Sequence, residues 1–143
     1  MRTWILLADA ANGRLYESRG GRSDWTLVRE FSHPESRALE QELVSDKPGR
    51  VKQSSGRRAA MEPRTRRHKV EMEKFARELA KALEALVDAS APDRIVLVTP
   101  PTFLGLLRGH LAPRVEARIT AIVEKDYLHL EQPELKERLH EQL

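Results

Sequence analysis

The chain has 143 residues, 40% of them hydrophobic and 33% charged, which suits one globular domain with a buried core. It contains no cysteine, so disulfide bonds, thiolate metal sites and cysteine nucleophiles are excluded, and its net charge is only +3. Apolar runs such as Ile5–Ala8 and Ile95–Val98 are far shorter than the roughly 18 residues of a membrane span. No signal peptide is recognisable, so we expect a cytoplasmic protein.

The first third of the chain predicts three β-strands. Three runs rich in strand-forming residues are separated by turn residues: Thr3–Asp9, Arg14–Arg19 and Trp25–Phe31. Asn12-Gly13 lies between the first two runs and favours a tight hairpin, because both residues tolerate positive φ angles. We therefore expect an antiparallel three-stranded meander.

A short helix and a long loop are expected next. Ser32 and Glu35 have the spacing of a capping box, with a proline in the first turn, which predicts a helix to about Leu43. From about residue 45 to 64 the apolar periodicity is lost, and proline, glycine and serine recur. This stretch is predicted to be a flexible basic loop.

The second half alternates helices and strands. Apolar residues between Val70 and Val87 recur at steps of three and four, which predicts a helix over about 65–88. The remaining expected elements are a strand at Arg94–Thr99, a helix to about Leu111, a strand at Ile119–Glu124 and a helix at Pro133–Leu143. The pattern predicts a single α/β domain over residues 1–143, with a mixed five-stranded sheet and the succession of ribonuclease H-like folds.

The small net charge conceals a strong asymmetry. Residues 47–69 contain nine cations and one anion, a charge of +8, which leaves −5 for the rest of the chain. This pattern favours a local polyanion-binding element, and a solvated loop is the alternative. The candidate phosphate-binding residues are Lys52, Arg57, Arg58, Arg64, Arg66, Arg67 and His68.

Common catalytic motifs are missing from the sequence. No histidine pair has the spacing of a helical zinc site, and no Walker or Gly-x-Ser-x-Gly motif occurs, so we predict no metal and no cofactor. Asp9 with Glu71 or Glu73 is a candidate two-metal nuclease site, but the sequence favours a turn role or a polar strand end for Asp9. The amide of Gln53 can both donate and accept hydrogen bonds, so the basic loop could bind RNA or place Gln53 at a reactive ester.

Five segments of the sequence resemble the bacterial host attachment family, whose members are described as required for attachment to host cells. They are Asp46–Arg50, Gly56–Pro63, Phe75–Leu79, Pro100–Arg108 and Glu124–Tyr127, and the resemblance covers nearly the whole chain. Because no export signal is recognisable, we expect any role in attachment to be indirect.

That family in turn resembles the middle domain of archaeal and eukaryotic peptide-chain release factors. There, the glutamine of a Gly-Gly-Gln loop assists peptidyl-tRNA hydrolysis on the ribosome. The resemblance puts Gln53 in that position, with Val51-Lys52 in place of the two glycines. The leading hypothesis is RNA binding, to tRNA or the ribosome; the alternatives are a peptidyl-tRNA hydrolase using Gln53 and an interaction module for an acidic protein partner.

Overall fold

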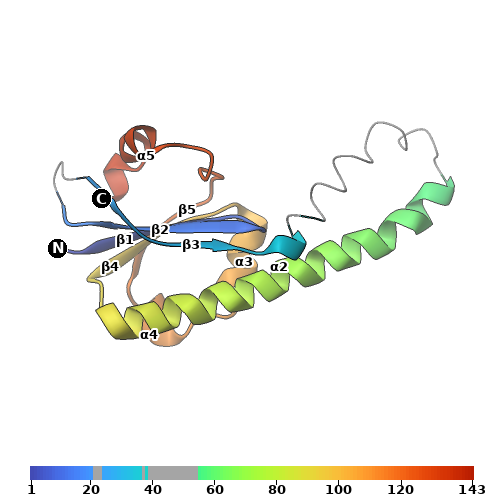
Figure 1. Cartoon of the computed structure of the whole chain (residues 1–143), viewed down its shortest axis with the longest axis horizontal. Coiled ribbons are helices and arrows are strands. Elements are labelled where there is room, and N and C mark those ends of the chain that lie inside the picture. The colour runs from blue at the N-terminus through green and yellow to red at the C-terminus, as the bar shows by residue number, and fades with distance from the viewer. Residues whose placement is uncertain (21–23, 37, 39–54) are drawn as a thin grey trace.

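The centre of the computed structural model is a five-stranded mixed sheet with the strand order β3-β2-β1-β4-β5 (Figure 1). The strands are β1 (Thr3–Ala8), β2 (Asn12–Ser18), β3 (Thr26–Ser32), β4 (Arg94–Val98) and β5 (Ile119–Val123). The first three strands pair antiparallel, whereas β1, β4 and β5 run parallel. The predicted α/β fold with a five-stranded mixed sheet is therefore confirmed.

The structure describes residues 1–20, 24–36, 38 and 55–143, with residues 55–65 described as backbone only. Its helices are α2 (Ser55–Ser90), α3 (Pro101–Arg108), α4 (Pro113–Glu116), α5 (Gln132–Arg138) and a 3-10 turn at His140–Gln142. Residues 34–36 are also helical, where the sequence predicts a short helix, and residues 45–54 of the predicted loop lie outside the described residues. Within the described part, no helix has both the length and the apolar composition to cross a membrane.

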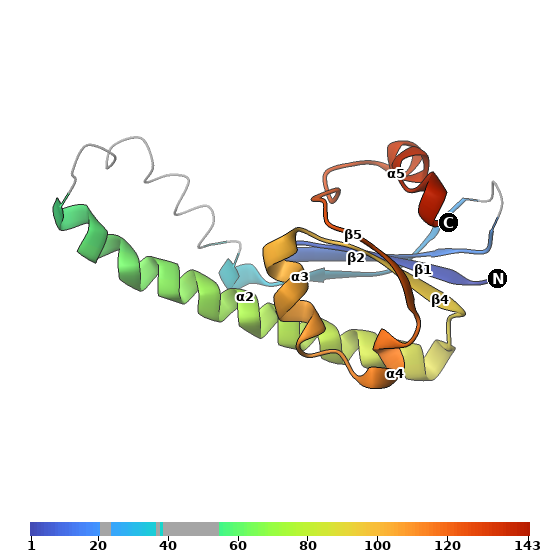
Figure 2. The same cartoon turned by 180° about the vertical axis from the view of Figure 1, so that it is seen from behind.

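Strand β1 is buried on both faces because helices cover both sides of the sheet. Trp4 and Leu6 pack with Leu83 of α2 in one core layer, which α3 and α4 complete. Ile5 and Leu7 point to the other face, where α5 covers the sheet (Figures 1 and 2). Two-sided burial explains why β1 and β4 are continuous apolar runs rather than alternating ones.

The prediction that Asn12-Gly13 forms the first hairpin turn is wrong. Gly13 lies within β2 and pairs with Ala8, so the turn that joins β1 and β2 consists of residues 9–12. The backbone N–H of Asp9 donates to the carbonyl of Asn12 at 2.9 Å. The Asp9 carboxylate accepts hydrogen bonds from the backbone N–H groups of Ala11 and Asn12, at 2.8 and 2.7 Å. An aspartate side chain therefore closes this turn, and positive φ angles are not needed.

Helix α2 begins at Ser55, earlier than the predicted start near Thr65. The sequence favours a start after Pro63, because an interior proline removes one backbone hydrogen bond. The residues just before it, Ala59-Ala60-Met61-Glu62, are strong helix formers and continue the helix through the proline. The predicted helix after β4 ends at Arg108, and the short helix α4 follows it. The predicted helix at Pro133–Leu143 is a helix at Gln132–Arg138 followed by a 3-10 turn at His140–Gln142.

Candidate functional site

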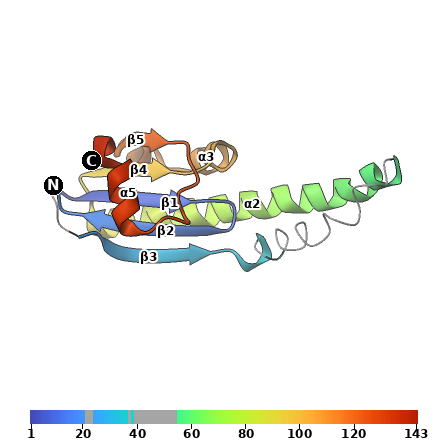
Figure 3. The ribbon, with the colours of Figure 1, turned by 90° about the horizontal axis from the view of Figure 1, so that it is seen from above.

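Helix α2 consists of a half that is anchored to the sheet and a half that projects beyond it. The first of its described side chains to be buried is Met72, and the buried residues after it recur at helical spacing: Phe75, Ala76, Leu79, Ala80, Leu83 and Val87. Residues 55–70 extend past the end of the sheet (Figures 1 and 3). At 1.5 Å per residue, this projecting segment, residues 55–70, is about 24 Å long.

Positive charge dominates the projecting segment. It contains one anion, Glu62, and six cations: Arg57, Arg58, Arg64, Arg66, Arg67 and Lys69. Arg66, Arg67 and Lys69 are exposed, and within the described part of the chain none of the three forms an ion pair. These three charges are therefore open to a ligand.

Two arginines in the body of the protein, Arg2 and Arg114, are paired with carboxylates instead. Arg2 lies 3.0 Å from the carboxylate of Glu17. Arg114 donates two hydrogen bonds to Asp88 at 2.8 and 2.9 Å, and these bonds lower the pKa of the Asp88 carboxyl. These two arginines are engaged within the body of the protein, whereas Arg66, Arg67 and Lys69 are not engaged by a described carboxylate.

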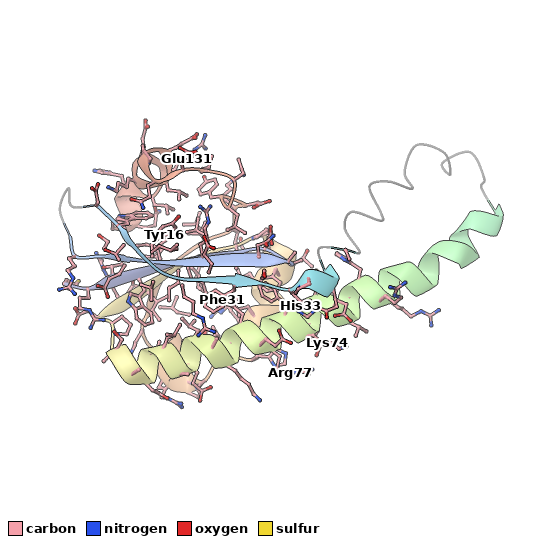
Figure 4. The ribbon with its side chains drawn as sticks, in the orientation of Figure 1. Tyr16, Phe31, His33, Lys74, Arg77 and Glu131 are labelled. Carbon is pink, nitrogen blue, oxygen red and sulfur yellow. The ribbon has the colours of Figure 1, made fainter. Side chains whose placement is uncertain are left out.

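His33 lies at the end of β3 beside α2, at the base of the projecting segment (Figure 4). There it forms a cluster with three glutamates that joins these two elements. Nε2 of His33 lies 2.7 Å from Oε2 of Glu71 and 3.7 Å from Oε2 of Glu35. Nδ1 of His33 lies 3.5 Å from Oε2 of Glu78. The imidazole is buried and stacks on Phe75, with ring centroids 5.7 Å apart. We call these four charged residues, His33, Glu35, Glu71 and Glu78, the His33 cluster.

The surroundings of the His33 cluster favour an ionised Glu71. Its hydrogen bond with His33 lowers the pKa of the Glu71 carboxyl, and the opposing effect of burial is smaller. Lys74 adds a hydrogen bond to Glu71 at 3.3 Å. The backbone N–H of His33 donates to the carbonyl of Ala11 at 2.9 Å, which ties the cluster to the β1–β2 turn. The cluster therefore connects three parts of the chain.

The residues predicted to bind phosphate or to catalyse are only partly visible in this arrangement. Lys52 and Gln53 lie outside the described residues, so their roles stay predictions. Three of the predicted arginines, Arg57, Arg58 and Arg64, are placed on α2 by its backbone alone. His68 is half-buried on the same helix, and its Nδ1 is buried without a hydrogen-bond partner in the described part of the chain.

Asp9 has the turn role that the sequence favours. Its carboxylate is occupied by the two backbone N–H groups of the β1–β2 turn. A cleft of about 710 Å³ opens beside it, and Arg14, Asp126 and His129 contribute to its lining. Among the residues that the structure describes, Asp9 has no pair of acidic or histidine partners close enough to share a metal ion with it. The nuclease alternative therefore gains no support from this geometry.

Sequence reasoning did not identify the His33 cluster. The sequence pattern favours a capping role for Glu35 and offers Glu71 only as an aid to Asp9, and His33 and Glu71 are 38 positions apart in the chain. The one available signal is local: Glu71 and Glu78 are seven residues apart, so they share a face of a predicted helix. Which residue that face meets depends on how α2 docks on the sheet.

Comparisons with known proteins identify a family and a distant structural likeness. A family model described as "Protein required for attachment to host cells" matches residues 4–139. No curated protein matches the chain. Among solved structures, an archaeal translation termination factor, aRF1, aligns with a TM-score of 0.43 and 12% identity over 85% of this chain. The aligned part is 29% of the termination factor, so this chain spans under a third of that protein.

Proposed function

This chain belongs to the family of proteins required for attachment to host cells, and we propose that it binds RNA through the projecting segment of α2. One observation carries the proposal: Arg66, Arg67 and Lys69 are exposed on a helix that extends past the sheet, with no ion pair in the described part of the chain. Any role in attachment then follows indirectly from RNA binding.

Phosphate binding accounts for the charge of this segment better than local stability does. The N-terminus of a helix carries a partial positive charge, which favours acidic residues nearby. The first turn of α2 contains no acidic residue, and Arg57 and Arg58 lie close to the helix start. A phosphate polymer would supply the missing negative charge to both the helix end and the arginines. Each phosphate neutralised by a cation also releases condensed counterions, which favours binding.

The length of the projecting segment fits an extended anionic ligand. Six cations are distributed over about 24 Å of helix at 1.5 Å per residue. A nucleic-acid strand presents a charge at every nucleotide, so several of these cations can meet phosphates at once. A small anion would engage one or two of them and leave the rest unpaired.

The test is equilibrium binding of the full chain to fluorescein-labelled tRNA, followed by fluorescence anisotropy over a range of salt concentrations. The test variant is Arg66→Gln/Arg67→Gln. The matched control is Lys81→Gln/Lys125→Gln, which removes the same charge from exposed cations elsewhere that form no ion pair in the described part of the chain.

We expect the test variant to bind more weakly and its salt dependence to flatten. Losing two phosphate contacts reduces the slope of log affinity against log salt by about 1.4–1.8. The control should retain the slope of the unmodified protein. Equal slopes for all three proteins would refute the proposal. If a poly-glutamate peptide competed as well as unlabelled tRNA, the segment would instead be a site for an acidic protein.

A further inference from the structure

The ligand atoms of His33, Glu35 and Glu71 are already close enough to surround a metal ion. Nε2 of His33 and one carboxylate oxygen from each glutamate all lie within 4.8 Å of one another. Donor atoms around a tetrahedral zinc ion, each about 2.0–2.1 Å from the metal, are separated by about 3.3 Å. The distances from His33 to Glu71 and Glu35, 2.7 and 3.7 Å, lie on either side of that value. Small side-chain rotations would therefore complete the geometry.

We propose that His33, Glu35 and Glu71 bind one divalent transition-metal ion, with Zn²⁺ as the representative. An imidazole nitrogen with two carboxylates suits zinc and its first-row neighbours. Magnesium and calcium prefer sites made entirely of oxygen ligands. The site is distinct from the projecting segment and does not depend on RNA binding.

The second ring nitrogen of His33 has the partner that a metal-binding histidine requires. Nδ1 faces the Glu78 carboxylate at 3.5 Å, on the opposite side of the ring from Glu71. The hydrogen bond to the Glu71 carboxylate places a proton on Nε2. A metal ion bound to Nε2 replaces that proton, and the Glu78 carboxylate then holds the remaining ring proton on Nδ1. Stacking on Phe75 fixes the plane of the ring. Glu78 is thus a positioning residue behind the site.

The charges in the His33 cluster are unbalanced without a further cation. Three carboxylates face the single imidazole, and the nearest lysine, Lys74, forms an ion pair with Glu71 at 3.3 Å. Counted over the described residues, this group carries an excess of one negative charge if the imidazole is protonated and of two if it is neutral. A divalent ion removes this excess at a place where one partner, His33, is 5% exposed.

Unsatisfied polar atoms occur on both elements that the site connects. Ser36 follows Glu35 in the chain, is fully buried and has no hydrogen-bond partner for its hydroxyl in the described part of the chain. The buried Nδ1 of His68, one helical turn before Glu71, likewise has no partner among the described residues. Buried polar atoms without partners are rare. Ser36 is thus next in sequence to one proposed ligand, and His68 is three residues from another.

The ion would crosslink the residues after β3 to α2. Glu35 belongs to the residues that follow β3, whereas Glu71 lies on α2 just after the projecting segment. Binding would join these two parts of the chain and stabilise the fold in proportion to the logarithm of free metal concentration.

The experiment is isothermal titration calorimetry of the full chain with ZnCl₂ after removal of metals by EDTA. The variants are Glu35→Gln and Glu71→Gln, and the control is Glu73→Gln, an exposed glutamate on the same helix whose partners include Arg77. Because the Glu35 side chain is 64% exposed, its replacement should not disturb folding. Thermal unfolding of each variant without metal checks that point.

We expect one zinc ion per chain, with affinity at least about tenfold weaker in each test variant and unchanged in Glu73→Gln. Cobalt(II) should bind at the same site and give a visible absorption band that Glu35→Gln weakens. Zinc uptake that is unsaturable, or equally tight in Glu35→Gln and Glu71→Gln, would overturn the proposal. If magnesium bound as tightly as zinc, the assignment of the site to transition-metal ions would be wrong.

Discussion

Replacing Phe75 with alanine tests how α2 is held on the sheet. The side chain is 2% exposed, and its ring stacks on His33 and Phe103 with centroid distances of 5.7 and 5.6 Å. A buried phenylalanine truncated to alanine costs about 3–5 kcal/mol. We expect a cost near the upper end of this range at Phe75, because each aromatic pair contributes about 0.5–1.5 kcal/mol beyond the effect of burial. We expect a loss of about 4–5 kcal/mol from a total of roughly 5–15 kcal/mol.

Urea denaturation, followed by tryptophan fluorescence, measures this loss, since Trp4 and Trp25 are both buried and report unfolding. Phe75→Leu keeps most of the side-chain volume and should cost about 1–2 kcal/mol. Val70→Ala alters a side chain on the projecting segment that is 51% exposed, and should change stability by less than about 0.5 kcal/mol. A loss below about 1 kcal/mol for Phe75→Ala, or equal losses at Phe75 and Val70, would refute the division of α2 into anchored and projecting halves.

Two further substitutions test the sheet. Hydrogen bonds from Trp4 and Arg2 hold the pKa of Glu17 below its usual value of 4.5. A carboxyl whose pKa is lower in the folded than in the unfolded protein makes its full contribution to stability above the unfolded-state pKa. That contribution is lost as the pH falls through the folded-state pKa. The stability gap between the unmodified protein and Glu17→Gln, measured by urea denaturation, should therefore shrink below about pH 4.5; a constant gap would contradict this. Asp9→Ala should cost about 1–3 kcal/mol and Asp9→Asn less, since the amide keeps one acceptor oxygen; equal costs would contradict the turn role.

The local features of this fold could be predicted because they depend on neighbouring residues. The strand at β4 follows from a short apolar run, and the docked part of α2 follows from apolar steps of three and four. The first turn could not be predicted in the same way, because Asn12-Gly13 and Asp9 both offer turn chemistry and the pairing of Gly13 with Ala8 decides between them. The start of α2 was missed because proline at 63 outweighed the helix formers before it.

The sequence by itself determined the order of the strands and the longer helices, the mixed sheet and the concentration of positive charge between residues 47 and 69. These properties depend on side-chain spacing and composition over short stretches. Only the tertiary structure decided that α2 leaves the core at Met72 and that His33 meets Glu71, 38 residues away. The reason is physical: such contacts depend on where separate elements end when their apolar faces pack together, and no local pattern specifies those ends.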